Sequence, residues 1–290
     1  MAVRCRAGSG VDLGKGCQVI KRALNQKTAR HLSYEAFLDL ASDLGCVGVE
    51  PRNDLGRPLF DGIAPRQAGE MASSKGLRLL GLSEVYPFND WSQERGAAVQ
   101  ALIRAAAESG AETVSLIPRV DGKAVDDGIR QAELRKAMRH VLPMLHGTGV
   151  VALIEPIGFA SSSLSDASEL VEAIEDVGGT GKFRMVHDTF QHTIAGGGPL
   201  FAPYTSTIHI SGISDPGPAL DEKLDSQRVL VDEFDRCNTI QQIAAFIEAG
   251  YSGAFSFECT SPIVQRSATL KADIRCSFEF IEGSLQCIRA

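Results

Sequence analysis

Short apolar runs alternate along the chain with longer segments of helical periodicity, and this alternation constrains the fold more than any other feature. Apolar runs rich in β-branched residues are typical of buried parallel strands, and helical segments between them are typical of crossover connections. Since no G-x-G-x-x-G turn or P-loop follows the first run, eight such units favour a closed α/β barrel, a (β/α)₈ TIM barrel, over an open doubly wound sheet. The eight runs lie at residues 17–24, 46–50, 77–83, 112–117, 150–155, 183–188, 207–211 and 254–258.

The segments between the runs carry helix start and stop signals. Ser33 opens one of them and Gly45 closes it. The same scheme recurs at residues 92–110, 127–147 and 238–250.

One barrel accounts for the length of the chain. Barrels of this type use about 200 to 400 residues as a single domain, and the chain has 290 residues. We predict one barrel domain over residues 17–290. Residues 1–16 are rich in glycine and basic side chains, and we predict a flexible N-terminal extension there.

The charge balance limits the partners of the protein. The formal net charge is −7, and both nucleic acid and anionic membranes attract proteins through a basic field. No apolar run approaches the roughly 20 residues that cross a bilayer, and the N-terminus lacks the apolar centre of a secretory signal. We therefore expect a cytoplasmic protein that binds neither nucleic acid nor a membrane.

Polar residues close several of the predicted strands. In a barrel of this type the active site lies at the carboxyl ends of the strands. The fifth to eighth runs end with four residues of metal-ligand type, which are Glu155, Asp188, His209 and Glu258. A buried carboxylate is costly unless it meets a cation or several donors, so this quartet predicts one bound divalent metal.

The ligand set indicates which metals fit. Three carboxylates and one imidazole form a hard, oxygen-rich site that suits Mn²⁺ or Mg²⁺ and tolerates Zn²⁺ or Co²⁺. A structural zinc site would more typically use thiolates, and no C-x-x-C pair is present. The alternative is that each of the four residues separately bonds a loop or an arginine.

Two histidines flank Asp188. His187 should point away from the barrel interior, because side chains alternate along a strand, and we expect a structural role. His192 follows in the loop over the mouth, where we expect it to contact substrate or to act as an acid behind the metal ligands.

The strand-end quartet resembles that of the xylose-isomerase-like barrel superfamily of sugar isomerases and epimerases. Longer stretches resemble bacterial inosose isomerases, which act on 2-keto-myo-inositol. One departure is that the sixth strand continues with Gln191 before His192, where the family motif often reads Asp-Thr-Phe-His. The stretches are ALN, GVEPRNDL, YPFNDW, HDTFQH, HISGISD, QRVLV and GYSGAFSFE, and they extend from the first strand to the eighth.

The resemblance implies a metal-dependent isomerase in inositol catabolism whose substrate is a small keto-polyol. Glu155 and Glu258 would lie on opposite sides of the substrate and transfer a proton through a metal-stabilised enediolate. Related barrels often form dimers or tetramers, which leaves a homo-oligomer open. Side chains that would contact substrate hydroxyl groups are Asn25, Arg52, Asn53, Trp91, His192 and Arg228.

Other functions use the same barrel. An inosose dehydratase or a ketose 3-epimerase would share the metal and the enolate chemistry. A nuclease similar to endonuclease IV would need more metal-binding histidines and a basic groove, and the acidic balance disfavours it. A noncatalytic sugar-binding barrel would bind the polyol without converting it.

Overall fold

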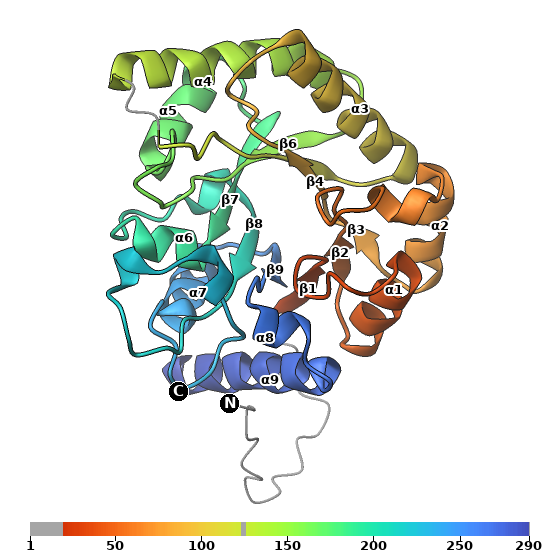
Figure 1. Cartoon of the computed structure of the whole chain (residues 1–290), viewed down its shortest axis with the longest axis vertical. Coiled ribbons are helices and arrows are strands. Elements are labelled where there is room, and N and C mark those ends of the chain that lie inside the picture. Colours follow the sequence, from red (N-terminus) through yellow and green to blue (C-terminus); the bar gives the residue numbers. More distant parts are fainter. Residues whose placement is uncertain (1–19, 123–125, 290) are drawn as a thin grey trace, which may run out of the picture.

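The computed structural model describes residues 20–122 and 126–289, and in this part of the chain parallel strands form a ring surrounded by helices (Figure 1). The order of strands in the sheet is β3-β2-β1-β9-β8-β7-β6-β5-β4. Their bounds are β1 Lys21–Asn25, β2 Gly48–Glu50, β3 Arg78–Leu79, β4 Leu82–Val85, β5 Thr113–Leu116, β6 Val151–Ile154, β7 Phe183–Asp188, β8 Thr205–Ile210 and β9 Ala254–Phe257.

Strands β3 and β4 are two parts of the third predicted run, so the nine strands make eight units. Gly81 lies in the break, where an added Cβ atom would approach Thr113 Oγ1 to 2.6 Å. Strand β3 pairs with β2, and β4 pairs with β5. Beyond the break, the Ser83 N–H donates to the Pro51 carbonyl and the Asn53 N–H donates to the Ser83 carbonyl, at 3.1 and 2.8 Å. These bonds join the two ends of the sheet, and the predicted TIM barrel is confirmed.

The outer layer consists of helices whose starts follow the predicted signals. The Ser33 hydroxyl accepts a hydrogen bond from the Ala36 N–H and caps α1, and Ser92 caps α3 in the same way. The α-helices are α1 Tyr34–Asp43, α2 Pro65–Ser74, α3 Gln93–Ser109, α4 Asp127–Val141, α5 Ala167–Asp176, α6 Thr189–Ile194, α7 Thr239–Glu248, α8 Pro262–Gln265 and α9 Leu270–Arg289. Short 3₁₀ helices are η1 Leu59–Gly62, η2 Leu142–Leu145, η3 Ala202–Tyr204, η4 Leu220–Glu222 and η5 Asp225–Gln227.

Large apolar side chains fill the space between the ring and the helices. Phe37 of α1, Phe246 of α7 and Phe278 of α9 are fully buried, and Phe257 of β9 packs on Phe278 with ring centroids 4.5 Å apart. This layer fixes the strands from outside and leaves their inner face to polar residues near the carboxyl ends.

Two sequence predictions fall partly or wholly on residues without a description. The predicted N-terminal extension, residues 1–16, lies outside the described residues, and the first predicted strand begins in the described part at Lys21.

Among the described helices, none combines the length and apolar composition that a membrane span requires.

Two helical glycines provide a matched test of this packing. An added Cβ atom at Gly69 of α2 would lie 2.1 Å from the Ser109 carbonyl oxygen at the end of α3, whereas at Gly283 of α9 it would meet nothing within 4 Å. We expect Gly69→Ala to lower the free energy of unfolding by about 1 to 3 kcal/mol. Gly283→Ala should raise it by roughly 0.5 to 1 kcal/mol, because alanine favours the helix. Urea titration measures both, and equal effects of the two substitutions would contradict this account of the α2 and α3 contact.

Candidate metal centre

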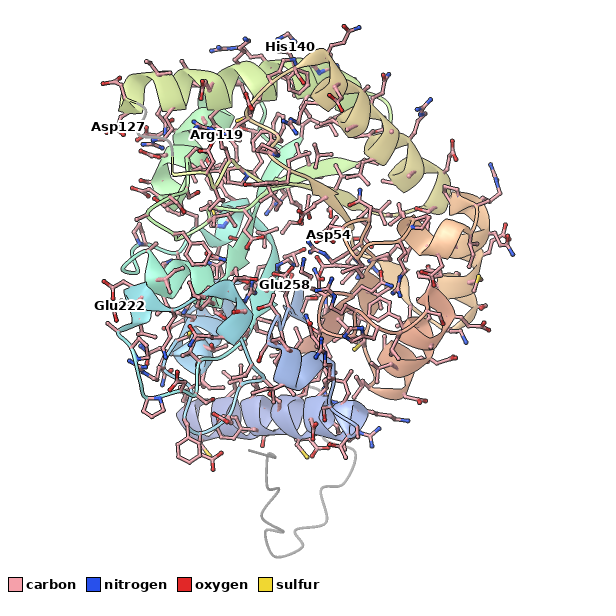
Figure 2. All side chains as sticks on the ribbon, in the orientation of Figure 1. Asp54, Arg119, Asp127, His140, Glu222 and Glu258 are labelled. Atoms are coloured by element: carbon pink, nitrogen blue, oxygen red, sulfur yellow. The ribbon has the colours of Figure 1, made fainter. Side chains whose placement is uncertain are left out.

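The four strand-end residues meet at one place inside the barrel mouth. Glu155 directly follows β6, Asp188 ends β7, His209 lies in β8 and Glu258 directly follows β9. All four side chains are buried, and one ligand atom from each lies within 4.8 Å of the others. Figure 2 shows Glu258 near the centre of the ring of strands.

The register of the strands explains why these side chains converge. Asp188 pairs with His209 across β7 and β8, and His209 pairs with Ser256 across β8 and β9. Paired residues in a parallel ladder point to the same face, and so do residues two apart on one strand. Glu258, two residues after Ser256, therefore shares the inner face with Asp188 and His209.

Two buried arginines hold Glu258 from both sides. Arg52 Nη1 donates to Glu258 Oε1 at 2.8 Å, and Arg228 Nη2 donates to Glu258 Oε2 at 3.1 Å. Arg228 also pairs with Asp188. The remaining donors of Arg52 bind Glu84 and Asp54, with its Nε atom 2.7 Å from Asp54 Oδ1. Sequence analysis predicted both arginines near the site, and the structure brings both to the quartet.

Negative charge exceeds positive charge in this network. Three fixed cations, Lys27, Arg52 and Arg228, face seven carboxylates, so four negative charges remain if every carboxylate is ionised and His209 is neutral. Like charges at short range in a buried site repel strongly, and a divalent cation relieves this repulsion. The carboxylates are Glu50, Asp54, Glu84, Glu155, Asp188, Asp225 and Glu258.

The acid–base properties of the quartet express the same excess. Burial, followed by the charges of Glu258 and Asp188, raises the pKa of Glu155 well above its usual range. Burial would also raise the pKa of Glu258, but His209, Arg228 and Arg52 hold it well below its usual range. Burial would lower the pKa of His209, but Glu50 and Glu258 raise it well above the ordinary value. A bound cation favours ionised carboxylates and an unprotonated imidazole on the same atoms.

The donor atoms fit a divalent metal ion. His209 Nδ1 is buried without a hydrogen-bond partner and lies 3.3 Å from Glu258 Oε2 and 3.9 Å from Glu155 Oε2. A set of carboxylate oxygens and one imidazole nitrogen suits Mn²⁺, Mg²⁺ or Zn²⁺. The buried cluster could therefore hold one metal ion.

Two predicted substrate contacts have other roles in the structure. The Trp91 ring stacks on the ring of His140 with centroids 4.9 Å apart, and His140 lies at the outer rim of the molecule (Figure 2). Both ends of the Asn53 amide bind the backbone of Glu84, at 2.8 and 3.2 Å. In the structure Trp91 packs between helices and Asn53 holds a loop, and the contact of either with substrate stays a prediction.

Asn25 and His192 lie on different sides of the strands. Asn25 ends β1 and is fully buried; its Oδ1 accepts from the Lys27 N–H, and its Nδ2 has no partner. His192 lies beside His187, with ring centroids 4.8 Å apart, and His187 points away from the barrel interior toward Phe246 of α7. His187 thus has the predicted structural position, whereas His192 lies on the outer side of β7.

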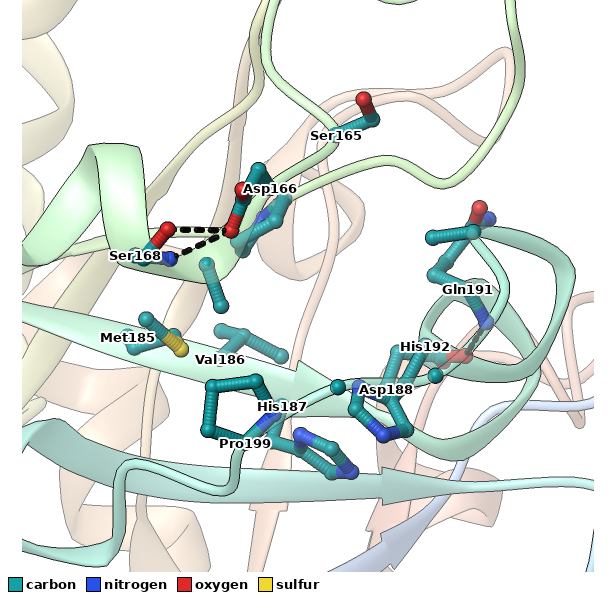
Figure 3. Close-up of a pocket in the computed structure, with 15 residues that line it drawn as sticks. Ser165, Asp166, Ser168, Met185, Val186, His187, Asp188, Gln191, His192 and Pro199 are labelled. Carbon is teal, nitrogen blue, oxygen red and sulfur yellow. Dashed lines mark hydrogen bonds between the residues drawn. The ribbon is translucent and has the colours of Figure 1, made fainter.

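A cavity of about 240 Å³ lies on this outer side of β7, between α5 and α6 (Figure 3). Asp188 borders it, and Figure 3 shows the His187 and His192 rings together at its wall. Asp166 caps α5 there by accepting hydrogen bonds from Ser168. Of the quartet, Asp188 alone lines this cavity, so the cavity is separate from the convergence point of the ligand atoms.

The comparison with known families agrees with this geometry. The family model described as "Xylose isomerase-like TIM barrel" matches residues 38–280. The chain belongs to the xylose isomerase-like TIM barrel family. No curated protein matches the chain by sequence.

Several solved structures superimpose on more than nine-tenths of the chain. A xylose isomerase domain containing protein from Salmonella typhimurium LT2 is 27% identical, with a TM-score of 0.82, and the match covers 97% of this chain and 100% of that one. The IolI protein, solved with a zinc atom, is 14% identical with a TM-score of 0.80, covering 92% and 99%. D-psicose 3-epimerase from Clostridium cellulolyticum H10, solved with D-tagatose, is 14% identical with a TM-score of 0.69, also covering 92% and 99%. At 14% identity, the last two likenesses show the fold alone.

Two carboxylates beside the quartet were not among the site residues predicted from the sequence. Glu50 ends β2 and contacts His209, and Glu84 lies in β4 and pairs with Arg52. The rule that polar residues at strand ends face the barrel mouth could have identified both residues. Their contacts join residues 32 to 159 positions apart, which the spacing of the sequence does not reveal.

Asp188 permits a clean test of metal binding. Its Oδ1 atom also caps α6 by accepting from the N–H groups of Phe190 and Gln191, and an asparagine oxygen can do the same. We expect Asp188→Asn to lower Mn²⁺ affinity at least about tenfold while the fold persists, because a charged ligand is lost. Isothermal titration of metal-stripped protein measures the affinity. Asp166→Asn at the cap of α5 is the control, and equal Mn²⁺ affinity in the two variants would contradict the proposed centre.

Proposed function

We propose that the protein is a divalent-metal-dependent isomerase of a cyclic keto-polyol, with 2-keto-myo-inositol (an inosose) as substrate and a role in inositol catabolism. The observation that carries this proposal is the convergence of four ligand atoms, from Glu155, Asp188, His209 and Glu258, within 4.8 Å of one another in the barrel mouth. Xylose isomerase-like barrels that include IolI and sugar 3-epimerases share the fold, and IolI was solved with zinc.

The quartet would hold the metal, and the metal would act as a Lewis acid that stabilises negative charge on the reacting ketone. Glu155 and Glu258 would also serve as the proton-transfer pair. One glutamate would remove the proton from the carbon next to the carbonyl to give an enediolate, and the proton of the neighbouring hydroxyl group would pass to the former carbonyl oxygen. The other glutamate would return a proton to the former carbonyl carbon. Moving the carbonyl by one carbon in this way needs no redox cofactor, because the oxidation of one carbon balances the reduction of its neighbour.

The arginines would prepare the site for this chemistry. Arg52 and Arg228 each contact one oxygen of Glu258, which fixes the orientation of that carboxylate. A positioned base needs no reorganisation when the proton moves. Arg228 would in addition bind a substrate hydroxyl group through its Nη1 group, which has one N–H beyond the bond to Asp225. Asn25 has a free amide donor for the same purpose.

The two glutamates provide the first test. We expect Glu155→Gln and Glu258→Gln each to lower turnover by about 10² to 10⁴, because each removes a group that transfers a proton. Proton NMR of 2-keto-myo-inositol in deuterated water, with Mn²⁺ removed before measurement, follows both solvent exchange and product. Glu108→Gln, an exposed change on α3, should have no effect. Full activity in either active-site variant would exclude the proposed pair.

The product distinguishes the proposal from its alternatives. Signals of a positional isomer of the inosose support the isomerase, whereas loss of water to a diketone would identify a dehydratase. Conversion of a ketose instead would identify a 3-epimerase, which is the activity named for three of the similar structures. Metal retention without exchange on an inosose or a ketose would indicate a noncatalytic sugar-binding barrel.

Metal removal provides the second test. We expect a chelator to abolish activity and added Mn²⁺ to restore it, because the enediolate would lose the charge that stabilises it. Metal content is measured by mass spectrometry in parallel with activity. Undiminished activity after verified removal of the metal would contradict the mechanism.

A further inference from the structure

Glu50 is a buried carboxylate that contacts the histidine of the quartet from the side opposite to the other ligands. Glu50 Oε2 lies 3.0 Å from His209 Nε2, and both side chains are almost fully buried. The other ring nitrogen of His209, Nδ1, faces Glu258 and Glu155. The two nitrogens of one imidazole ring therefore face two different sets of carboxylates.

The backbone fixes this contact across the barrel. Glu50 pairs with Asn25 on β1, and Ala23, two residues earlier, pairs with Ser256 on β9, which in turn pairs with His209 on β8. All these positions share the inner face of the barrel by strand alternation. Gly81 lies beside Glu50, since an added Cβ atom there would be in van der Waals contact with Glu50 Oε2, at 3.8 Å.

The chemistry of imidazole gives this arrangement a consequence. A neutral imidazole carries one N–H donor and one lone pair, and the partner of one nitrogen decides which nitrogen carries the proton. An ionised carboxylate beside Nε2 accepts hydrogen bonds and cannot donate them. The proton of the imidazole therefore stays on Nε2, and the lone pair on Nδ1 points to the quartet. A negative charge behind the ring also makes Nδ1 a stronger ligand.

We propose that Glu50 is a positioning residue that fixes the tautomer and orientation of His209 for metal binding. This inference rests on the proposed function, because it assumes that the quartet holds a metal. Glu50 does not touch the metal or the substrate in this account, and it acts through His209 alone.

Zinc affinity of metal-stripped protein, measured by competition with a chelator, tests this role. We expect Glu50→Ala to weaken zinc binding by about 100-fold and Glu50→Gln by about tenfold, since glutamine keeps an acceptor oxygen but loses the charge. Ser256→Ala is the matched control. It removes a buried hydroxyl group on the same inner face, from the residue that pairs with His209 through the backbone. It should leave zinc affinity within about threefold of the wild type, because the Ser256 hydroxyl group forms no hydrogen bond.

A second readout separates positioning from packing. In zinc-loaded wild-type protein, the Nε2–H proton of His209 should give a downfield NMR resonance that exchanges slowly with water. This resonance should persist in Ser256→Ala and disappear in Glu50→Ala. Circular dichroism of the metal-free variants verifies that they fold. If Glu50→Ala does not fold, the zinc affinity and the NMR resonance of Glu50→Gln test the role of Glu50.

The outcomes distinguish this inference from the proposed function. If the wild type binds zinc tightly and a folded Glu50 variant binds it equally tightly, the proposed role of Glu50 is overturned. The metal centre itself would stand. Failure of the wild type to bind any of Mn²⁺, Mg²⁺, Co²⁺ or Zn²⁺ would overturn the metal centre and this inference together.

Discussion

Repulsion among buried carboxylates is the constraint on which the rest of the site depends. Glu155, Asp188 and Glu258 are almost fully buried and close together, and their mutual repulsion is large in a poorly solvated environment. Arg52 and Arg228 offset part of this charge by direct contacts. The remaining excess raises the pKa of Glu155 and Asp188 after the effect of burial. A divalent cation would balance that excess on the same oxygens, which is why the barrel mouth is suited to metal chemistry.

The barrel makes this crowding sustainable. The apolar layer between strands and helices, with residues such as Phe246 and Phe278, supplies burial energy on the outer face of the strands. The strand ladders then hold Asp188, His209 and Glu258 on one face at neighbouring positions. The packing that stabilises the barrel and the site for chemistry therefore occupy different faces of the strands.

Much of this arrangement could be predicted from the sequence, because it follows from local patterns. The apolar runs and the helix caps at Ser33 and Ser92 depend on nearby residues, and the inward direction of Asp188 and the outward direction of His187 follow from strand alternation. The convergence of the quartet could also be anticipated, since strand ends meet at the mouth of a barrel.

The features that could not be predicted depend on contacts between distant residues. The break between β3 and β4 depends on the close approach of Gly81 to Thr113 of the next strand. Trp91 matched a motif, but its ring stacks on His140, 49 positions later in the chain. The fork of Arg52 joins Asp54, Glu84 and Glu258, and only the folded barrel brings these carboxylates to one guanidinium group.

The most direct measurement of the central claim is anomalous X-ray diffraction from crystals of the protein soaked in Mn²⁺. The account predicts one strong anomalous peak within bonding distance, about 2.0 to 2.3 Å, of Glu155, Asp188, His209 and Glu258. A metal-free quartet in such crystals, or a peak elsewhere with the four side chains held by arginines alone, would contradict it.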